Sequence, residues 1–174
     1  IQFYGTDFLD QFEKDLAQAF KKQLALLDLS LGKITSFHPA PDELTAFTCV
    51  NIDTELADCS YMIAESVNNG RALNIGLVDQ LTAGDPPKRA KRQAISTGAP
   101  GMILSPTSPH ACIIVGWSHY IEDIDELVNV ILQEMIIFSG VGPQGEQVLD
   151  LKSLILNPEQ LRQLHQPPLF YNCD

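Results

Sequence analysis

The stretch from Gly101 to Gly140 constrains the fold of this chain most strongly, because it holds the longest succession of apolar segments in the sequence. Two apolar runs of strand length, 102–104 and 111–115, flank a connection with two prolines, which cannot continue a central ladder of hydrogen bonds. We therefore expect a hairpin here, followed from about Tyr120 by a helix.

The helix expected after Tyr120 is apolar around most of its surface. Ser118 can accept a hydrogen bond from a free amide at its start, and the acidic residues within 122–126 suit the positive end of a helix dipole. Apolar residues recur at steps of three and four, and in the second half they also fill much of the opposite side, up to Gly140. Such a helix either closes the core of its own chain or forms a surface for self-association.

Apolar periodicity predicts further elements on both sides of this stretch. They are a helix at 7–28, strands at 34–37, 45–52 and 71–78, a helix from about 53 to 67, an edge strand at 147–151 and a short helix from 157. The succession of strand 45–52, helix and strand 71–78 is the pattern of a right-handed βαβ unit, which would make these two strands parallel neighbours. The predicted fold class is α/β (or α+β): a single mixed β-sheet of about five to six strands with helices packed on it, including one βαβ unit and one hairpin.

The chain length predicts one domain. A chain of 174 residues can bury about two thirds of the surface that its unfolded form exposes, so we assign residues 1–174 to a single domain. Between residues 82 and 100 the apolar periodicity is lost, and glycine, proline and charged residues take over. We expect a long polar, partly basic loop there, and a loop of this length in a domain is usually functional or disordered.

The net charge of −11, from 22 acidic and 11 basic residues, would repel a phosphate backbone and disfavours nucleic-acid binding. A local exception lies in the expected loop, where four basic residues fall within five positions. These candidates for contact with an acidic partner are Lys88, Arg89, Lys91 and Arg92. A solvated loop is the simpler interpretation of the same cluster.

Cysteine usage and hydropathy predict a cytoplasmic protein without a membrane-spanning helix. The cysteines, Cys49, Cys59, Cys112 and Cys173, form no CxxC pair, and three of them lie in apolar segments, as in a reducing compartment. No run of about 18 apolar residues exists, and the first residues do not resemble a signal peptide. The chain opens with Ile1 rather than methionine, so residues can be missing upstream.

Carboxylates supply the first candidate site. If the βαβ unit forms, Asp53 and Asp79 follow the carboxyl ends of neighbouring parallel strands, where open α/β sheets bind ligands. With Glu55 or Asp85 nearby, they could hold Mg²⁺ for phosphoryl or phosphodiester hydrolysis. The structural alternative is that Asp53 caps a helix and Asp79 serves in a turn.

Other candidates fit known sites less well. His110, Cys112 and His119 bracket one strand but span too far for a single zinc ion without a sharp bend. Ser118 followed by a histidine lies where a nucleophile elbow would, without the second glycine of that motif. The letters GxGxxG at 140–145 follow a helix rather than a strand.

No motif lies in the structural context that its chemistry requires, so we assign no catalytic residue, no metal and no cofactor. We expect a non-catalytic cytoplasmic binding or assembly module that acts as a homo-oligomer or with a protein partner. The apolar helix, the aromatic residues of 166–171 and the polar loop at 82–100 support this expectation. The alternative is a metal-dependent hydrolase with carboxylates at the carboxyl ends of parallel strands.

Overall fold

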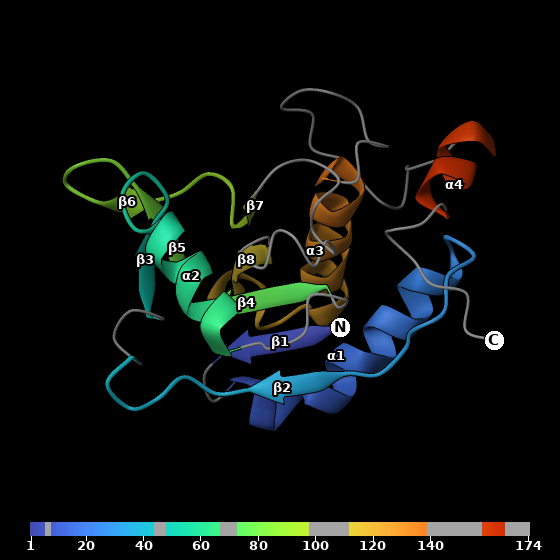
Figure 1. Ribbon diagram of the computed structural model, residues 1–174, viewed down its shortest axis with the longest axis horizontal. Coiled ribbons are helices and arrows are strands. Elements are labelled where there is room, and N and C mark those ends of the chain that lie inside the picture. Colours follow the sequence, from blue (N-terminus) through green and yellow to red (C-terminus); the bar gives the residue numbers. More distant parts are fainter. Residues whose placement is uncertain (6–7, 44–47, 67–72, 98–111, 139–157, 166–174) are drawn as a thin grey trace.

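The computed structural model describes residues 1–5, 8–43, 48–66, 73–97, 112–138 and 158–165 (Figure 1). Within these residues, helices pack against two β-sheets. The helical elements are α1 (Phe8–Ala25), α2 (Leu56–Ser66), the 3₁₀ turn η2 (Trp117–Tyr120), α3 (Ile124–Phe138) and α4 (Pro158–Leu164). The predicted α/β class, with helices packed on a mixed sheet, is confirmed, although the strands form two sheets rather than one.

The main sheet has five strands in the order β2-β1-β4-β8-β7. Their bounds are β2 (Thr35–Phe37), β1 (Gln2–Gly5), β4 (Asn74–Val78), β8 (Cys112–Gly116) and β7 (Ala94–Thr97). The first four strands are parallel, and β7 runs antiparallel at the edge. Every residue of β4 and β8 is buried, as expected for parallel strands covered on both faces.

The second sheet has three strands, β3 (Cys49–Asn51), β5 (Gln80–Ala83) and β6 (Lys88–Arg89). Strand β5 begins one residue after β4 and pairs in parallel with β3 and antiparallel with β6. In Figure 1 this small sheet and α2 lie toward one end of the molecule, and α4 lies toward the other.

The alternation of side chains along the main strands divides the apolar residues between two cores. In β1, Phe3 joins the core formed with α1 and α3, whereas Tyr4 joins the core formed with α2 and the small sheet. In β8, Ile113 belongs to the first core and Ile114 to the second. This period of two follows from the opposite directions of successive side chains in a strand.

Helix α3 is packed into the core of its own chain. It contacts α1, β7 and β8. Its buried apolar residues are Leu127, Val128, Ile131, Leu132, Met135 and Ile136. The sequence left two interpretations of this helix open, closure of the chain's own core or self-association. The structure places its buried apolar residues in the core.

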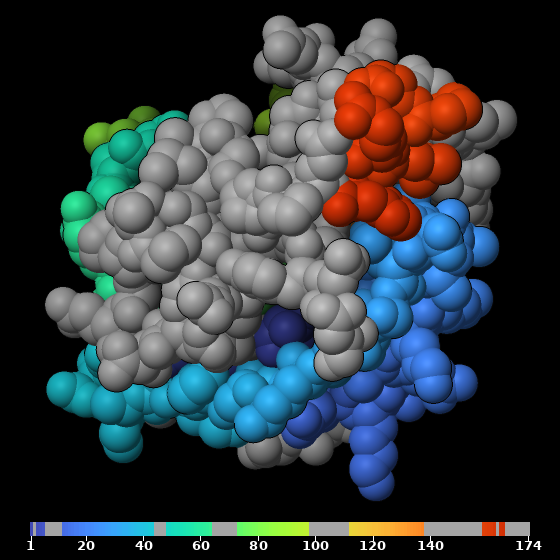
Figure 2. Space-filling model, turned by 45° about the vertical axis from the view of Figure 1, so that its right-hand side comes forward, coloured from blue at the N-terminus to red at the C-terminus, as the bar shows by residue number. Residues whose placement is uncertain are grey.

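Helix α4 docks beside the end of α1 (Figure 2). Leu164 of α4 is fully buried in the core that α1 and α3 share. The ring Nε2 of His165 lies 2.9 Å from the carbonyl oxygen of Leu27, just beyond α1. Asp28, with φ of 54°, then takes the left-handed conformation that often ends a helix. No helix within the described ranges is long and apolar enough to cross a membrane.

Two local predictions are wrong, and one strand was missed. The expected loop at 82–100 contains β6 and β7, and β7 rather than residues 102–104 is the described antiparallel partner of β8. The first strand, β1, lies inside the main sheet and was not predicted. The long helix begins at Ile124 rather than near Tyr120, because the side chain of Asp123, and not Ser118, accepts an amide of its first turn. The predicted strands at 102–104 and 147–151 lie outside the described residues.

Candidate functional site

The turn between β3 and α2 positions Asp53. Its centre is Asn51, whose side-chain oxygen accepts the Asp53 amide at 3.0 Å and whose carbonyl accepts the amides of Thr54 at 3.2 Å and Glu55 at 2.8 Å. In return, the Glu55 carboxylate accepts the Asn51 amide at 2.7 Å. This reciprocal arrangement resembles a capping box, so Glu55 serves to start α2.

The carboxylate of Asp53 fastens the turn that follows β5. Its Oδ2 accepts the amide of Gly84 at 2.8 Å, and the side-chain amide of Asn51 donates to the Gly84 carbonyl at 3.1 Å. Gly84 has φ of 82°, a conformation that glycine adopts without strain. Asp85 is the next residue of this turn and is exposed. The Asp53 carboxylate therefore connects the end of β3 to the β5–β6 turn.

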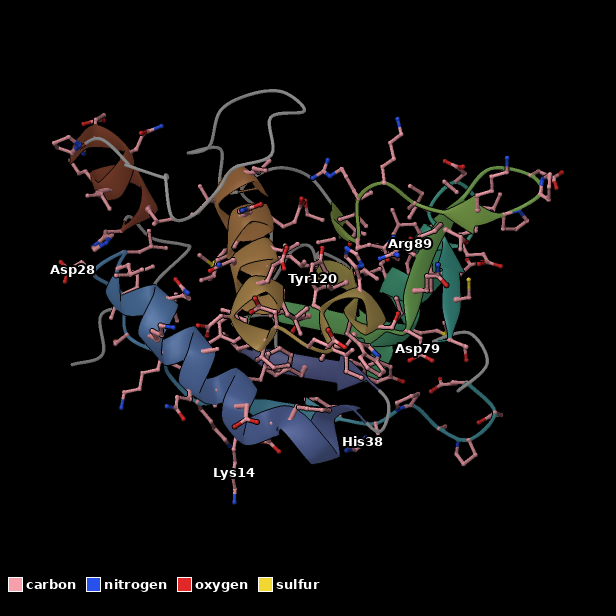
Figure 3. All side chains as sticks on the ribbon, turned by 180° about the vertical axis from the view of Figure 1, so that it is seen from behind. Lys14, Asp28, His38, Asp79, Arg89 and Tyr120 are labelled. Carbon is pink, nitrogen blue, oxygen red and sulfur yellow. The ribbon has the colours of Figure 1, made fainter. Side chains whose placement is uncertain are left out.

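Asp79 lies elsewhere, at the junction of the two sheets. It is the single residue between β4 and β5, and its carbonyl oxygen accepts the amide of Ser118 at 3.2 Å. Figure 3 shows Asp79 on the same side of the molecule as Arg89, which belongs to β6 of the small sheet. Asp79 thus marks the carboxyl end of β4, as the sequence predicted.

The two aspartates do not meet, because β3 pairs with β5 rather than with β4. Asn51 is paired with Thr82 in the two parallel strands. Asp53 comes two residues after Asn51 and therefore lies beside Gly84, two residues after Thr82; the hydrogen bond between Asp53 and Gly84 agrees with this placement. Gly84 is five residues beyond Asp79, or about 16 Å along an extended strand. The expectation that strands 45–52 and 71–78 are parallel neighbours is wrong. Across the described ranges, no group of three or more His, Cys, Asp or Glu residues is placed to hold a metal ion.

Of the four basic residues at 88–92, the two arginines contact side chains of other elements, whereas the two lysines are exposed. Arg92 forms an ion pair with Glu134, a carboxylate of α3 whose side chain is only 7% exposed. Ser96 also donates to Glu134, at 3.2 Å. A buried carboxylate needs such partners, so Arg92 serves to hold the segment before β7 against α3.

Arg89 contacts the ring Nδ1 of His119, and the remaining two, Lys88 and Lys91, are exposed. Because a guanidinium has no acceptor and no lone pair, the Nδ1 of His119 must be the acceptor in this contact. The cluster is therefore not one continuous free surface, since two of its four members bind other elements of the same chain.

An open pocket of about 450 Å³ lies between the start of α2 and the edge strand β7. Its lining residues come from the end of β3, the first turns of α2 and the end of β7: Ile52, Asp53, Thr54, Leu56, Ala57, Ser60, Ser96 and Thr97. The volume lies in the range of small-molecule sites. Of the predicted carboxylates, Asp53 lines this pocket, whereas Glu55, Asp79 and Asp85 are not among its lining residues.

The two buried thiols, Cys59 and Cys112, do not suit nucleophilic catalysis. Burial raises the pKa of Cys59 to about 12, assisted by the nearby Cys112 and Glu55. Burial also raises the pKa of Cys112 to about 12, although a hydrogen bond with Thr97 acts in the opposite direction. A thiolate is the reactive form, so both cysteines behave as small apolar core residues.

The remaining candidate site residues from the sequence are not brought together in the described part of the structure. His119 and Ser118 are exposed on η2, whereas Cys112 is buried at the start of β8. His110 and the GxGxxG letters at 140–145 lie outside the described residues. Sequence reasoning missed Ser60, Ser96 and Thr97, because a serine or threonine carries no signal of a pocket until the strand and helix that bear it are placed together.

Comparisons with protein-family models, with curated proteins and with solved structures found no match to this chain.

Proposed function

We propose that this protein is a non-catalytic binding module and that its ligand is a small molecule held in the pocket between α2 and β7. The observation that carries the proposal is the pocket itself, about 450 Å³ and lined by both apolar and polar residues. Small-molecule sites have this mixed character, in which apolar walls supply contact area and a few polar groups fix orientation.

The polar groups of the pocket favour binding over catalysis. Asp53 accepts an amide from Gly84, and the hydroxyl of Ser60 donates to the Ala57 carbonyl at 2.7 Å. Thr97 bonds to the backbone of Cys112. Groups fixed in this way orient a ligand well, whereas a general base or nucleophile needs a neighbouring group that activates it.

The oligomeric state and the cellular location are proposed from the sequence. The aromatic residues of 166–171 support action as an oligomer or with a protein partner, and the cysteine usage supports a cytoplasmic location. The alternative, a metal-dependent hydrolase, loses its main support, because Asp53 and Asp79 follow strands β3 and β4, which do not pair with each other.

Native mass spectrometry of the purified full chain tests the proposal. We expect the spectrum to contain a species whose mass exceeds that of the chain, or of its oligomer, by that of a small organic molecule. Replacing Ala57, an exposed residue of the pocket wall, by phenylalanine should fill the space and abolish this species. Asp58→Phe is the control, because it adds the same ring to α2 at an exposed residue that does not line the pocket.

Three results would count against the proposal. A retained molecule in the Ala57→Phe protein would place the ligand elsewhere. A divalent metal ion in place of an organic molecule would favour the hydrolase. A ligand-free monomer would contradict both the binding and the oligomer proposals.

A further inference from the structure

We infer that the pocket takes a small organic cation, an amine or a guanidinium that carries a short apolar group. This inference rests on the proposed function and adds the chemical class of the ligand. Three properties of the lining residues carry it: the direction of their hydrogen bonds, their charge and the position of their apolar side chains.

The hydroxyl groups of Ser60 and Ser96 in the pocket are already committed as donors. Ser60 donates its proton to the Ala57 carbonyl at 2.7 Å, and Ser96 donates to the Glu134 carboxylate at 3.2 Å. The Thr97 hydroxyl donates to the Cys112 carbonyl at 3.3 Å and accepts the Cys112 amide at 3.2 Å, so it is bonded within the protein in both directions. Each hydroxyl has one proton and two lone pairs, so what Ser60 and Ser96 have left to offer a ligand is acceptor capacity.

The charge at the pocket is negative. Asp53 uses one carboxylate oxygen for the Gly84 amide, which leaves the second oxygen as a charged acceptor. The amides at the start of α2 carry partial positive charge, but Asp58 in the first turn and Glu55 just before it offset that charge. The whole chain, at −11, adds a field that attracts cations and repels anions.

An apolar wall faces the same space. Ile52, Leu56 and Ala57 line the pocket beside Asp53, so a ligand that places a cationic group at the carboxylate can lay a short hydrocarbon chain against them. Burying this chain removes apolar surface from water and so adds to the affinity. Small cations that lack an apolar part would forgo that contribution.

The test uses three probes with the same four-carbon chain: n-butylammonium, n-butanol and n-butyrate. Each is titrated into the ¹⁵N-labelled full chain, and amide shifts of residues 52–60 and 94–97 are followed by NMR. We expect n-butylammonium to shift these amides at the lowest concentration and n-butyrate to leave them unchanged. Asp53→Asn should weaken n-butylammonium binding about tenfold, because it removes the charge of a charge-assisted hydrogen bond.

Asp53→Asn keeps an oxygen that can accept the Gly84 amide, so the turn should remain folded, and unchanged amide shifts away from the pocket would verify this. Binding of n-butyrate or n-butanol at least as tight as that of n-butylammonium would overturn the inference while leaving the binding module in place. An unaltered affinity in Asp53→Asn would overturn it as well. If none of the probes shifted the pocket amides, the proposed function itself would fail.

Discussion

Gly116 at the end of β8 permits a close approach between the two sheets. A β-carbon at this position would overlap the side-chain oxygen of Gln93 and lie 3.0 Å from the amide nitrogen of Leu81. Gln93 is buried, and its side chain exchanges hydrogen bonds with Leu81 at 3.2 and 3.1 Å and donates to the Ala90 carbonyl at 2.7 Å. Gln93 thus satisfies backbone groups of the small sheet, and the missing side chain of Gly116 makes room for it.

Gly116→Ala should therefore lower the free energy of unfolding by about 1–3 kcal/mol, the usual cost of forcing extra atoms into a packed site. Gly32→Ala is the control, because its β-carbon would meet nothing within 4 Å, and it should change stability by less than about 0.5 kcal/mol. Urea unfolding followed by circular dichroism measures both. Equal stability of the two variants would show that the close approach is absent.

Thiol reactivity should follow burial. At pH 8 a thiol with a pKa of about 12 is ionised in about one molecule in ten thousand, so Cys59 and Cys112 should resist iodoacetamide in the folded protein. Cys49 is exposed and should be alkylated. Peptide mass mapping of the native and urea-unfolded protein separates the three sites. Alkylation of Cys112 in the native state as fast as that of Cys49 would contradict the burial of β8.

The sequence allowed the role of Asp53 to be predicted only in part. Its position before a helix marked it as a turn or capping residue, and it does lie in the turn that leads into α2. Its partner Gly84 is 31 residues away and becomes a neighbour only through the pairing of β3 with β5. Such a contact depends on strand register, which no local pattern in this chain specifies.

At the scale of elements, β7 and the segment before it are attached to α3 through the ion pair between Arg92 and Glu134. Glu134 is nearly buried, whereas the Arg92 side chain is 54% exposed. Removing the arginine would leave a buried carboxylate with the Ser96 hydroxyl as its remaining partner among the described residues. An unpaired buried charge is costly, but the partial exposure of the pair moderates the effect.

We expect Arg92→Met to lower the free energy of unfolding by about 1–2 kcal/mol and to speed hydrogen exchange in β7. Lys91→Met is the matched control, since Lys91 is an exposed neighbour for which no ion pair is found in the described part of the chain. It should leave both quantities nearly unchanged. A loss of stability in Lys91→Met as large as that in Arg92→Met would show that general charge, and not the Glu134 contact, is responsible.

The two long helices could be predicted, whereas the edge strand β7 and the first strand, β1, could not. Helices α1 and α3 have 18 and 15 residues, enough for the apolar period to repeat several times. Strands β1 and β7 have four residues each, so their period of two scarcely repeats. Proline, glycine and charge around 82–100 are typical of a loop, and only the pairing of β7 with β8 overrides that pattern.

At the scale of the whole molecule, the pocket lies where the small sheet, α2 and the edge of the main sheet come together. The carboxyl ends of the main parallel strands, near Asp79 and η2, are a second candidate location, because open α/β sheets commonly bind ligands at that edge. The sequence pointed to carboxylates after strands, which included Asp53. It could not predict that this residue follows a strand of the small sheet, because that placement depends on β5 leaving the main sheet directly after β4.

Hydrogen exchange of the full chain, measured with and without a dialysable small-molecule extract of cells, tests the location of binding most directly. The account predicts slower exchange at residues 52–60 and 94–97, and loss of this protection in Ala57→Phe. Protection confined to residues 79 and 117–120 would instead place binding at the carboxyl ends of the main sheet and contradict the account.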